Sequence, residues 1–382
     1  MTKDNQTEER IALALSGGGV RAAVFHLGVL RFLAEQGQLE NVAEISTVSG
    51  GSLIIGAIFS HAGLVWPSSA QFLNETYPAL RTKLTSIDLF SLAALGWKGI
   101  LKENFRILFR RAKIFPTLLS SQWGIYGSLK DLPDKPEWHI NATCYETGKN
   151  WRFSKKMMGD WRFGRHFNPD VPIANSIAAS AAVPYAIGAL KFNLPEYGWW
   201  KTDPATKKPI EKIVPPLRTL RLWDGGAYEN MGLEAIYKPK QGLLTCDFLI
   251  CSDASGPLCM PKSFSILGTL QGRLNSPRLF DISSDQIRAL RSRMLMGSIE
   301  RREVKGVLVR MGTSMRQFGA DLKTLRECLT DDQAGIALNY PTNLTRISER
   351  DFDLIARHGH ELCQTTINSY VTLPFGKNRS FN

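Results

Sequence analysis

The stretch VAEISTVSGG, residues 42–51, decides the fold class of this chain. Residues 42–48 are mostly apolar and predict a buried strand, and SLIIGAIF at residues 52–59 predicts the helix that follows. Ser49 therefore lies on a sharp turn between the two, with small neighbours. Such a turn exposes the serine hydroxyl and points the N-terminus of the helix at a reacting oxygen, which is the geometry of a nucleophile elbow. The alternative is an ordinary turn whose serine only caps the helix.

A second turn, with three successive glycines, follows the first apolar segment. IALALS at residues 11–16 predicts a strand, GGG follows at residues 17–19, and an amphipathic helix is predicted from about residue 20 to 35. Glycines allow successive N–H groups to converge into an anion-binding nest, and the helix N-terminus adds partial positive charge. The nest could hold a phosphate or the oxyanion of an acyl-transfer intermediate. Arg21 could add a full charge there or cap the turn.

The same glycines also fit a competing interpretation. Gly17, Gly19 and Ala22 have the spacing of a dinucleotide-binding fingerprint after a first strand. That motif requires an acidic residue at the end of the second strand, about 20 residues further on, to hold a ribose. The second predicted strand instead runs into TVSGG at residues 47–51, which contains no carboxylate. We therefore disfavour a dinucleotide site.

A third element, RLWDGGAYEN at residues 221–230, contains a candidate base. Asp224, at a strand end and followed by two glycines, can project its carboxylate while the backbone turns away beneath it. Asp-Gly is also a common plain turn. Because a serine hydroxyl is a weak nucleophile unless a base lies within hydrogen-bond reach, Asp224 is the candidate partner of Ser49.

These three elements together resemble the patatin-like phospholipases. That family carries a glycine-rich oxyanion loop, a Gly-x-Ser-x-Gly elbow and an Asp-Gly-Gly or Asp-Gly-Ala motif, in this order. The matching residues here are Gly17–Arg21, Thr47–Gly51 and Asp224–Gly226. ASAAVP at residues 179–184 resembles the family's Ala-Ser-x-Ala-x-Pro segment, and residues 140–148 resemble its central strand and turn.

The resemblance implies a three-layer α/β/α fold with a mainly parallel central sheet, which the alternation of predicted strands and helices also favours. It implies a hydrolase of glycerophospholipids or lysophospholipids that uses no metal or cofactor. Ser49 would be the nucleophile and Asp224 the general base of a catalytic dyad. The implied oxyanion hole comprises Gly17, Gly18, Gly19, Val20 and Arg21. The implied supporting residues are Thr47, Gly50, Gly51, Gly225 and Gly226.

Two positions depart from the family pattern. Thr47 replaces the first glycine of the elbow with a β-branched residue at a crowded turn. Ala22 stands where family members usually have glycine. Both replacements are small, so we expect slight shifts of the loops that affect rate and substrate preference more than chemistry.

Two other functions stay open at this point. Ser49, Asp224 and then His358 or His360 follow the chain order of an α/β-hydrolase triad. That fold does not place a triple-glycine loop after its first strand and its nucleophile after the next, and FDLIARHGHEL at residues 352–362 predicts an ordinary surface helix. Alternatively, the glycine nest and a basic surface could form a catalytically inactive module that binds anions or membranes.

One elaborated domain, residues 11–382, is predicted after a polar tail at residues 1–10. An insertion at about residues 63–135 would form a cap or a membrane-facing element, and residues 331–372 would be helical and pack on the outside.

Among the later elements, core strands are predicted at residues 247–253 and 304–312, and a hairpin or loop insertion at residues 191–217. Ser284 is predicted to cap the start of a long helix.

Composition fits a globular protein. With 382 residues and 43% hydrophobic content, the chain can bury a large core. It contains no run of 18 apolar residues, so we expect no transmembrane helix, and residues 1–10 lack the hydrophobic part of a signal peptide. The six cysteines form no Cys-x-x-Cys pair, so we expect reduced thiols in a cytoplasmic protein.

The net charge of +12 favours anionic partners, either phospholipid headgroups or nucleic acid. No recognisable nucleic-acid module accompanies the charge, so we expect an anionic phospholipid membrane and peripheral association with it. Within residues 80–126, the mixture of leucine, aromatic and basic residues at residues 89–111 suits an interfacial amphipathic helix or a lid. Some bacterial relatives are switched on by a protein partner or a small molecule, and no residue here identifies such an activator.

Overall fold

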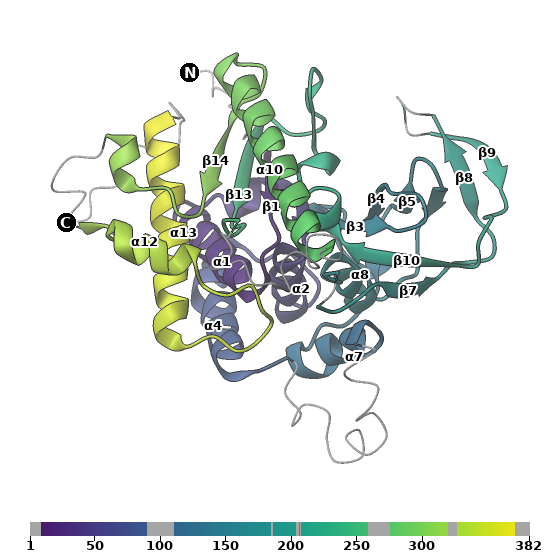
Figure 1. The fold of residues 1–382 in the computed structure, drawn as a ribbon, viewed down its shortest axis with the longest axis horizontal. Coiled ribbons are helices and arrows are strands. Elements are labelled where there is room, and N and C mark those ends of the chain that lie inside the picture. Colours follow the sequence, from purple (N-terminus) through teal and green to yellow (C-terminus); the bar gives the residue numbers. More distant parts are fainter. Residues whose placement is uncertain are drawn as a thin grey trace, which may run out of the picture.

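The chain folds around a mixed β-sheet with helices on both faces (Figure 1). A computed structural model describes residues 9–89, 111–184, 186–203, 206, 208–258, 276–319 and 327–370. Five parallel strands form the centre of the sheet, in the order β14-β13-β1-β2-β3. They are β1 (Ile11–Leu15), β2 (Val42–Val48), β3 (Glu137–Cys144), β13 (Phe248–Asp253) and β14 (Gly306–Arg310). The predicted fold, with its mainly parallel central strands, is confirmed.

An antiparallel extension continues the sheet beyond β3 and projects to the right in Figure 1. The sequence predicted only two parts of it: a strand that ends at Asp224, and a hairpin within residues 191–217 that the structure forms from β8 and β9. Its strands are β4 (Asn150–Phe153), β5 (Met157–Asp160), β6 (Gly164–Phe167), β7 (Leu190–Asn193), β8 (Trp199–Thr202), β9 (Pro209–Ile213) and β10 (Thr219–Asp224). A separate two-stranded ribbon pairs β11 (Tyr237–Lys238) with β12 (Gly242–Leu243).

Helices bury the two faces of β1 in two different clusters. Leu13 and Leu15 belong to the larger core, whereas Ala12 and Ala14 pack in a second cluster with Leu295. Because successive side chains of a strand point to opposite faces, these clusters lie on opposite sides of the sheet. The first side carries α1 (Gly19–Glu35), α2 (Gly50–His61), α8 (Ile173–Ser180) and α13 (Glu349–Tyr370), and the second carries α10 (Ser276–Glu300).

The prediction that Ser284 begins the long helix is wrong. The helix α10 already includes Ser276, so Ser284 lies inside it.

Shorter helices connect these elements. They are α3 (Ser69–Gln71), α4 (Tyr77–Ser86), α7 (Arg111–Trp123) and α12 (Asp331–Leu338), with a π-helical turn at Phe72–Thr76 and 3₁₀ turns at Leu39–Asn41, Leu129–Asp131, Gly225–Ala227, Leu233–Ala235 and Met315–Phe318. The predicted insertion at residues 63–135 thus contains α3, α4 and α7. Most of its predicted amphipathic part, residues 90–110, lies outside the described residues.

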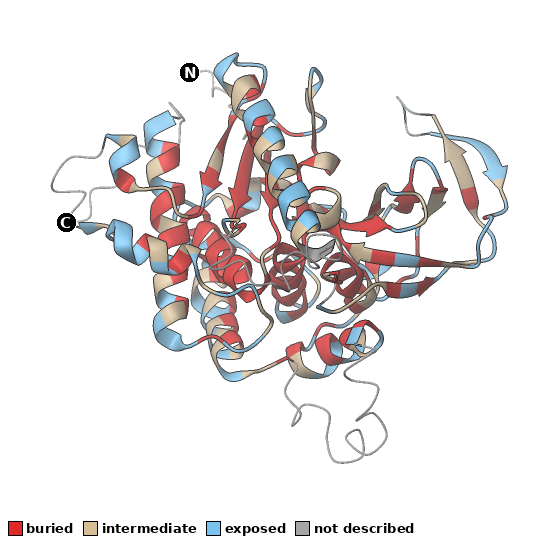
Figure 2. Ribbon diagram, viewed as in Figure 1, coloured by how far each residue is buried: buried red, intermediate tan, exposed pale blue. Residues whose placement is uncertain are grey.

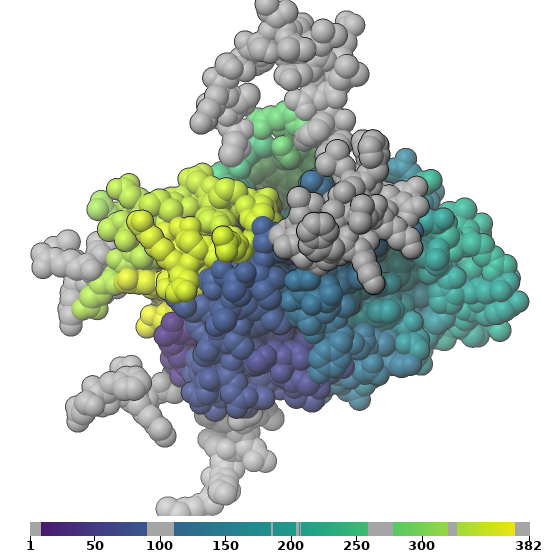
Figure 3. Space-filling view, turned by 90° about the horizontal axis from the view of Figure 1, so that it is seen from below, coloured from purple at the N-terminus to yellow at the C-terminus, as the bar shows by residue number. Residues whose placement is uncertain are grey.

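The C-terminal helix α13 has one exposed side, as predicted for a surface helix, and packs its buried side against α1. The predicted helical region at residues 331–372 is interrupted, because residues 339–348 between α12 and α13 form no helix. A Cβ on Gly28 would lie 1.9 Å from the carbonyl oxygen of Ala356, and one on Gly359 would lie 2.2 Å from that of Phe25. The two glycines therefore let the helix backbones touch, and His358 beside them is buried. Because Gly359 has charged neighbours in the sequence, the sequence pattern does not predict this helix contact. In Figure 3 the yellow surface of the C-terminal segment adjoins the blue surface that includes α4.

We expect Gly359→Ala to lower the free energy of unfolding by about 1–3 kcal/mol, because overpacking a closed contact costs about this much. Gly335→Ala in α12 is a matched control: nothing lies within 4 Å of its added methyl group. Since alanine favours a helix over glycine by about 0.5–1 kcal/mol, this control should be slightly stabilising. Urea unfolding followed by circular dichroism measures both. Wild-type stability of Gly359→Ala would contradict the close contact of α1 and α13.

Candidate active site

The register of three strands brings Ser49 and Asp224 together. The strand β2 pairs with β3 as far as Val48, which lies opposite Asn141. The strand β10 runs antiparallel to β3 and ends with Asp224 opposite Ala142. Because β4 occupies the other edge of β3 at Ala142, β10 continues the line of β2. The two strand ends therefore meet, and the residues at their ends become neighbours.

Ser49 has the strained backbone of a nucleophile elbow, with φ of 48° and ψ of −112°. A positive φ is uncommon outside glycine, and such strain costs about 1–3 kcal/mol. The N–H of Ser49 donates to Ser180 Oγ at 3.0 Å, which holds the turn. A Cβ on Gly50 would lie 2.3 Å from the carbonyl oxygen of Gly19. The elbow and the glycine loop thus pack backbone against backbone.

Thr47 occupies the place of the missing elbow glycine and takes part in the support of the turn. Its hydroxyl accepts a hydrogen bond from Trp138 Nε1 at 2.9 Å and lies 2.8 Å from Ser52 Oγ. Ser52 Oγ lies in turn 2.8 Å from Ser180 Oγ. A chain of three hydroxyl groups therefore leads from Thr47 to the N–H of the elbow.

Asp224 is a buried carboxylate, and only one of its two oxygens accepts a hydrogen bond from the described residues. Its Oδ1 accepts from the N–H of Gly226 at 2.7 Å, while Oδ2 has no hydrogen-bond partner among the described residues. Burial raises the pKa of Asp224 to about 6, against the lowering effect of the Gly226 N–H and of the Ser49 hydroxyl. The backbone N–H of Asp224 donates to the carbonyl of Ala182 at 2.9 Å. The segment at residues 179–184 therefore holds both Ser49 and Asp224.

The residues predicted as an oxyanion hole, Gly17–Arg21, have different partners. The N–H groups of Gly17 and Val20 already donate to backbone carbonyls, at 3.1 and 2.9 Å. The N–H groups of Gly18 and Gly19 donate to none of the described residues. Gly18 also lines the cavity at Ser49, and both glycines have a positive φ, 143° and 64°. The geometry thus leaves these two N–H groups available for a developing oxyanion.

A segment far along the chain, residues 338–343, holds the glycine loop from outside. The buried guanidinium of Arg21 donates to two backbone carbonyls of this segment at 3.3 and 2.7 Å. The N–H of Val20 donates to the carbonyl of Asn343, and a Cβ on Gly19 would lie only 2.3 Å from the same oxygen. Arg21 therefore ties the loop to the C-terminal part of the chain.

His26 holds the backbone at the start of the glycine loop. Its Nε2 lies 2.9 Å from the carbonyl oxygen of Ser16, which also accepts from the N–H of Gly51 at 3.2 Å. A carbonyl only accepts, so Nε2 carries the proton and Nδ1 accepts from the Ser252 hydroxyl at 2.8 Å. Burial lowers the pKa of His26 to about 4, so the imidazole is neutral at physiological pH. One carbonyl therefore links the loop, the elbow and the first helix.

Ser49 and Asp224 open on a cavity of about 350 Å³. It is also lined by residues of the glycine loop, of the segment after α8 and of α10, among them Gly18, Arg21, Val183, Pro184, Phe280, Ser284 and Arg288.

The histidines of the triad alternative lie elsewhere. His360 Nε2 is 2.6 Å from Glu35 and lines a separate cavity of about 880 Å³. His358 Nε2 accepts from the N–H of Gly312 at 2.9 Å. Neither histidine lines the cavity at Ser49.

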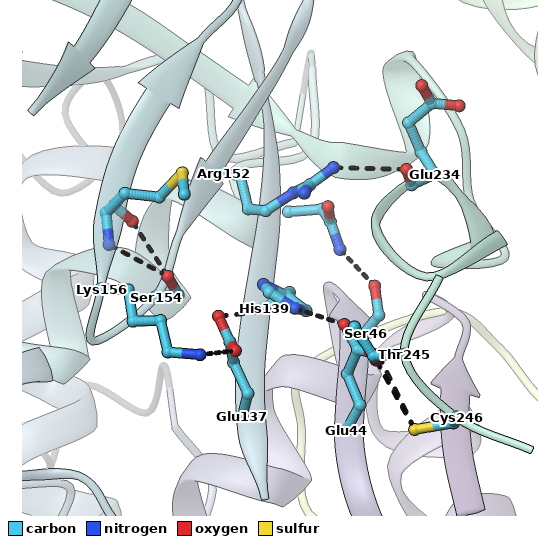
Figure 4. Close-up of polar contacts among 12 residues, drawn as sticks. Glu44, Ser46, Glu137, His139, Arg152, Ser154, Lys156, Glu234, Thr245 and Cys246 are labelled. Carbon is cyan, nitrogen blue, oxygen red and sulfur yellow. Dashed lines mark hydrogen bonds and ion pairs between the residues drawn. The ribbon is translucent and has the colours of Figure 1, made fainter. Parts of the chain in front are cut away.

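A buried polar cluster on β2, β3 and β4 lies apart from this cavity (Figure 4). Glu44 Oε1 is 2.8 Å from His139 Nε2, and Arg152 donates to the carbonyl of Glu234 at 3.3 Å. Burial alone would raise the pKa of Glu44, but hydrogen bonds from His139 and Thr245 hold it below its ordinary value. Burial lowers the pKa of Arg152 to about 10, which leaves it charged. The cluster anchors the segment that follows Asp224 to the sheet.

The family model described as patatin-like phospholipase matches residues 13–237. These residues include the glycine loop, the elbow and Asp224. The chain therefore belongs to the patatin-like phospholipase family. A comparison with curated protein sequences gives no match.

Solved structures of human GIVD cytosolic phospholipase A2 are similar in fold. One has a TM-score of 0.57 at 12% identity and covers 94% of this chain and 59% of that one. Its complex with methyl gamma-linolenyl fluorophosphonate and terbium chloride has a TM-score of 0.51 at 14% identity, covering 96% and 59%. VipD from Legionella pneumophila has a TM-score of 0.40 at 13% identity, covering 95% and 67%. This chain thus spans about three-fifths of the length of the human phospholipase chain.

Several residues that build the site have no recognisable signal in the sequence. Ser180 lies in the segment that resembles the family's Ala-Ser-x-Ala-x-Pro segment, and spacing alone does not assign its hydroxyl to Ser49. His26 lies on the first helix, and no motif in the sequence assigns it to the glycine loop. Asn343 contributes only its backbone carbonyl. A backbone contact of this kind requires no particular side chain, so the sequence does not indicate it.

We expect Ser180→Ala to lower the free energy of unfolding by about 1–3 kcal/mol and to reduce turnover, because the Ser49 N–H loses its acceptor. Ser176→Ala in the same helix is the control, since that hydroxyl is buried without a described partner and its loss should be neutral or stabilising. Urea unfolding and initial rates on one ester substrate measure both effects. Equal behaviour of the two variants would show that Ser180 does not hold the elbow.

We expect Asp224→Asn to stabilise the folded protein at pH 8 by up to about 3 kcal/mol, because a neutral amide replaces a buried carboxylate. The folded protein binds this proton more tightly than the unfolded chain. Wild type therefore loses stability as pH rises from about 4 to about 6, and the gain should vanish below about pH 4. Urea unfolding at pH 4 and pH 8 measures the gain. The same gain at both values would assign it to packing instead of ionisation.

Proposed function

We propose that this chain is a serine acyl hydrolase that cleaves ester-linked fatty acids from phospholipids or lysophospholipids. Membership of the patatin-like phospholipase family supports the reaction class. One observation carries the choice of catalytic residues. The ends of β2 and β10 meet along β3, so Ser49 lies beside a buried carboxylate with one unpaired oxygen.

In the proposed reaction, Asp224 takes the proton of Ser49 as the serine oxygen attacks the ester carbonyl. The N–H groups of Gly18 and Gly19 stabilise the resulting oxyanion. The bond to the alcohol then breaks, and the alcohol leaves with the proton held by Asp224, so the acyl group remains on Ser49. Water attacks this ester while Asp224 takes its proton. The fatty acid leaves, and the proton returns to Ser49.

The environment of Asp224 suits a general base. Its pKa of about 6 lies close to neutral pH, so the carboxylate is ionised yet basic enough to accept a proton. Each oxyanion donor contributes about 10²–10³ in rate in comparable enzymes, so the positions of Gly18 and Gly19 are as important as the base.

The cavity favours an amphiphilic substrate. Val183, Pro184 and Phe280 supply apolar lining, and the charged lining is mixed, with three arginines and three aspartates: Arg21, Arg278, Arg288, Asp224, Asp281 and Asp285. With a net charge of +12, the chain suits a membrane with anionic headgroups, and we propose peripheral association with a membrane at its cytoplasmic face. None of the helices in the described ranges is long and apolar enough to cross a bilayer. Activation by a small molecule or a protein partner is compatible with this proposal, and we do not expect a nucleic-acid partner.

A fluorescent fluorophosphonate should label wild type on Ser49, as located by mass spectrometry. This class of inhibitor is present in a solved complex of human GIVD cytosolic phospholipase A2. We expect no labelling of Ser49→Ala, and labelling of Asp224→Asn slower by about 10²–10⁴, the usual contribution of a general base. His360→Ala should label like wild type, since His360 contacts Glu35 away from the cavity.

Labelling of folded Ser49→Ala at the wild-type rate would refute the nucleophile. Loss of labelling in folded His360→Ala would favour the triad. A wild type that binds lipid vesicles, remains unlabelled and hydrolyses no lipid would favour an inactive binding module.

We expect kcat/KM to fall tenfold per pH unit below about pH 6, because Asp224 must be ionised to act as a base. A soluble short-chain ester serves as substrate, so that changes in a membrane do not enter the profile. A rate that stays constant down to pH 4, with the fold intact, would exclude Asp224 as the base.

A further inference from the structure

Asn230 lies where three loops of the site meet. It follows the Asp-Gly-Gly turn and lines the cavity together with Ser49 and Asp224. Its backbone carbonyl accepts from the N–H of Gly17 at 3.1 Å, and its Nδ2 donates to Ser255 Oγ at 2.8 Å. Asn230 therefore connects the glycine loop, the turn after β10 and the loop after β13.

Two of the strands that lead into these loops are fixed in the core. Both β1 and β13 are buried along their whole length, and they pair side by side in the sheet (Figure 2). The backbone N–H of Ser255 donates to the buried Asp253 Oδ1 at 3.1 Å, which holds Ser255 close to the end of β13. The hydrogen bond to Ser255 thus gives the Asn230 side chain a fixed position.

The Oδ1 atom of Asn230 occupies the space that two glycines leave open. A Cβ on Gly17 would lie 2.4 Å from this oxygen, and a Cβ on Gly226 would lie 2.6 Å from it. Cβ atoms do not approach other atoms this closely, so a side chain at either position would displace the amide. The amide is therefore a spacer between the first glycine of the glycine loop and the second glycine of the Asp-Gly-Gly turn.

The same two places border the residues proposed as nucleophile and base. The Cβ on Gly17 would also lie 3.0 Å from Ser49 Cβ, and the Cβ on Gly226 would also lie 3.0 Å from Asp224 Oδ1. Asn230 Oδ1 is therefore close to both side chains. Because the amide is neutral, it fills this place without adding a charge that would raise the pKa of Asp224 further.

We propose that Asn230 is a positioning residue: its amide sets the spacing between the N–H groups of Gly18 and Gly19 and the carboxylate of Asp224. The inference rests on the proposed function, because this spacing matters only if the N–H groups and the carboxylate act on one substrate. Reacting groups that are misplaced by about 1 Å can lose a factor of about 10² in rate. A spacer between their two loops therefore affects the rate without itself touching the substrate.

Truncation of the side chain tests the spacing. We expect Asn230→Ala to lower kcat on a soluble short-chain ester by about tenfold to a hundredfold, with KM nearly unchanged, because the substrate contacts are retained. The backbone carbonyl that holds Gly17 is still present in this variant. Ser255→Ala should lower kcat by a smaller factor, since the amide loses the partner that orients it. A merely structural role would lower the midpoint of urea unfolding without changing the kcat of the folded enzyme.

Asn230→Asp tests the position of the side chain beside Asp224. Aspartate has nearly the same shape, and the Ser255 hydroxyl can donate to it instead of accepting. A second carboxylate close to Asp224 raises the pKa of the base, so the acid limb of kcat/KM should move to higher pH by at least about one unit. The control is Thr342→Asp, which puts the same charge at an exposed position on the wall of the cavity. Water screens that charge, so the control should shift the limb by much less.

Two results would overturn the inference. One is a folded Asn230→Ala whose kcat lies within about twofold of wild type. The other is an Asn230→Asp whose acid limb moves no further than that of Thr342→Asp, and this result counts even if Asn230→Ala does not fold.

The proposed function fails separately. If wild type hydrolyses no ester, urea unfolding at pH 4 and pH 8 still locates the side chain. Two adjacent carboxylates repel each other when both are ionised, so Asn230→Asp should lose more stability at pH 8 than at pH 4, and Asp224→Asn in the same chain should restore it. With that result the arrangement of Asn230 and Asp224 stands and the reaction does not. Equal losses at both pH values would overturn the arrangement as well.

Discussion

The whole site depends on two strands that share one edge of β3. The strand β2 uses this edge as far as Val48, and β10 uses it from Asp224 in the opposite direction. Neither strand can lengthen without displacing the other. The backbone must therefore turn away from β3 at the end of each strand. The turn at the end of β2 becomes the strained elbow, and the turn at the end of β10 becomes the Asp-Gly-Gly loop. A slip of one residue in either register would turn the side chains to the opposite face.

Short-range patterns in the sequence predicted the centre of this arrangement. The strand at residues 42–48, the glycine turn and the Asp224 turn each carry their own signal, because apolar runs and small residues determine local backbone geometry. Contacts between distant segments carried no such signal. Gly28 and Gly359 matter only because their helices touch, and the carbonyl of Asn343 reaches the glycine loop whatever its side chain is. The strands β4, β5 and β6 of the antiparallel extension were missed because each is only four residues long.

The polar side chains that hold the turn at Ser49 are neutral. They therefore respond to pH differently from Asp224. Thr47, Ser52 and Ser180 link the elbow through hydroxyl groups, and His26 keeps a single proton because burial lowers its pKa to about 4. Between about pH 5 and 8 these supports do not change charge, whereas Asp224 does. A change of pH in this range therefore alters the charge of Asp224, the proposed base, without changing the charge of the groups that hold Ser49.

The hydrogen bonds between Arg21 and residues 338–343 affect the order in which the site assembles during synthesis. Ribosomes extend a chain from its N-terminus, so the glycine loop, Ser49 and Asp224 all emerge long before Asn343 does. Until then Val20 lacks its acceptor and Arg21 lacks its two carbonyls. A nascent chain that ends soon after the family-matched region thus carries both Ser49 and Asp224, but its glycine loop lacks the outer support. Full assembly of the site waits for a segment more than a hundred residues beyond Asp224.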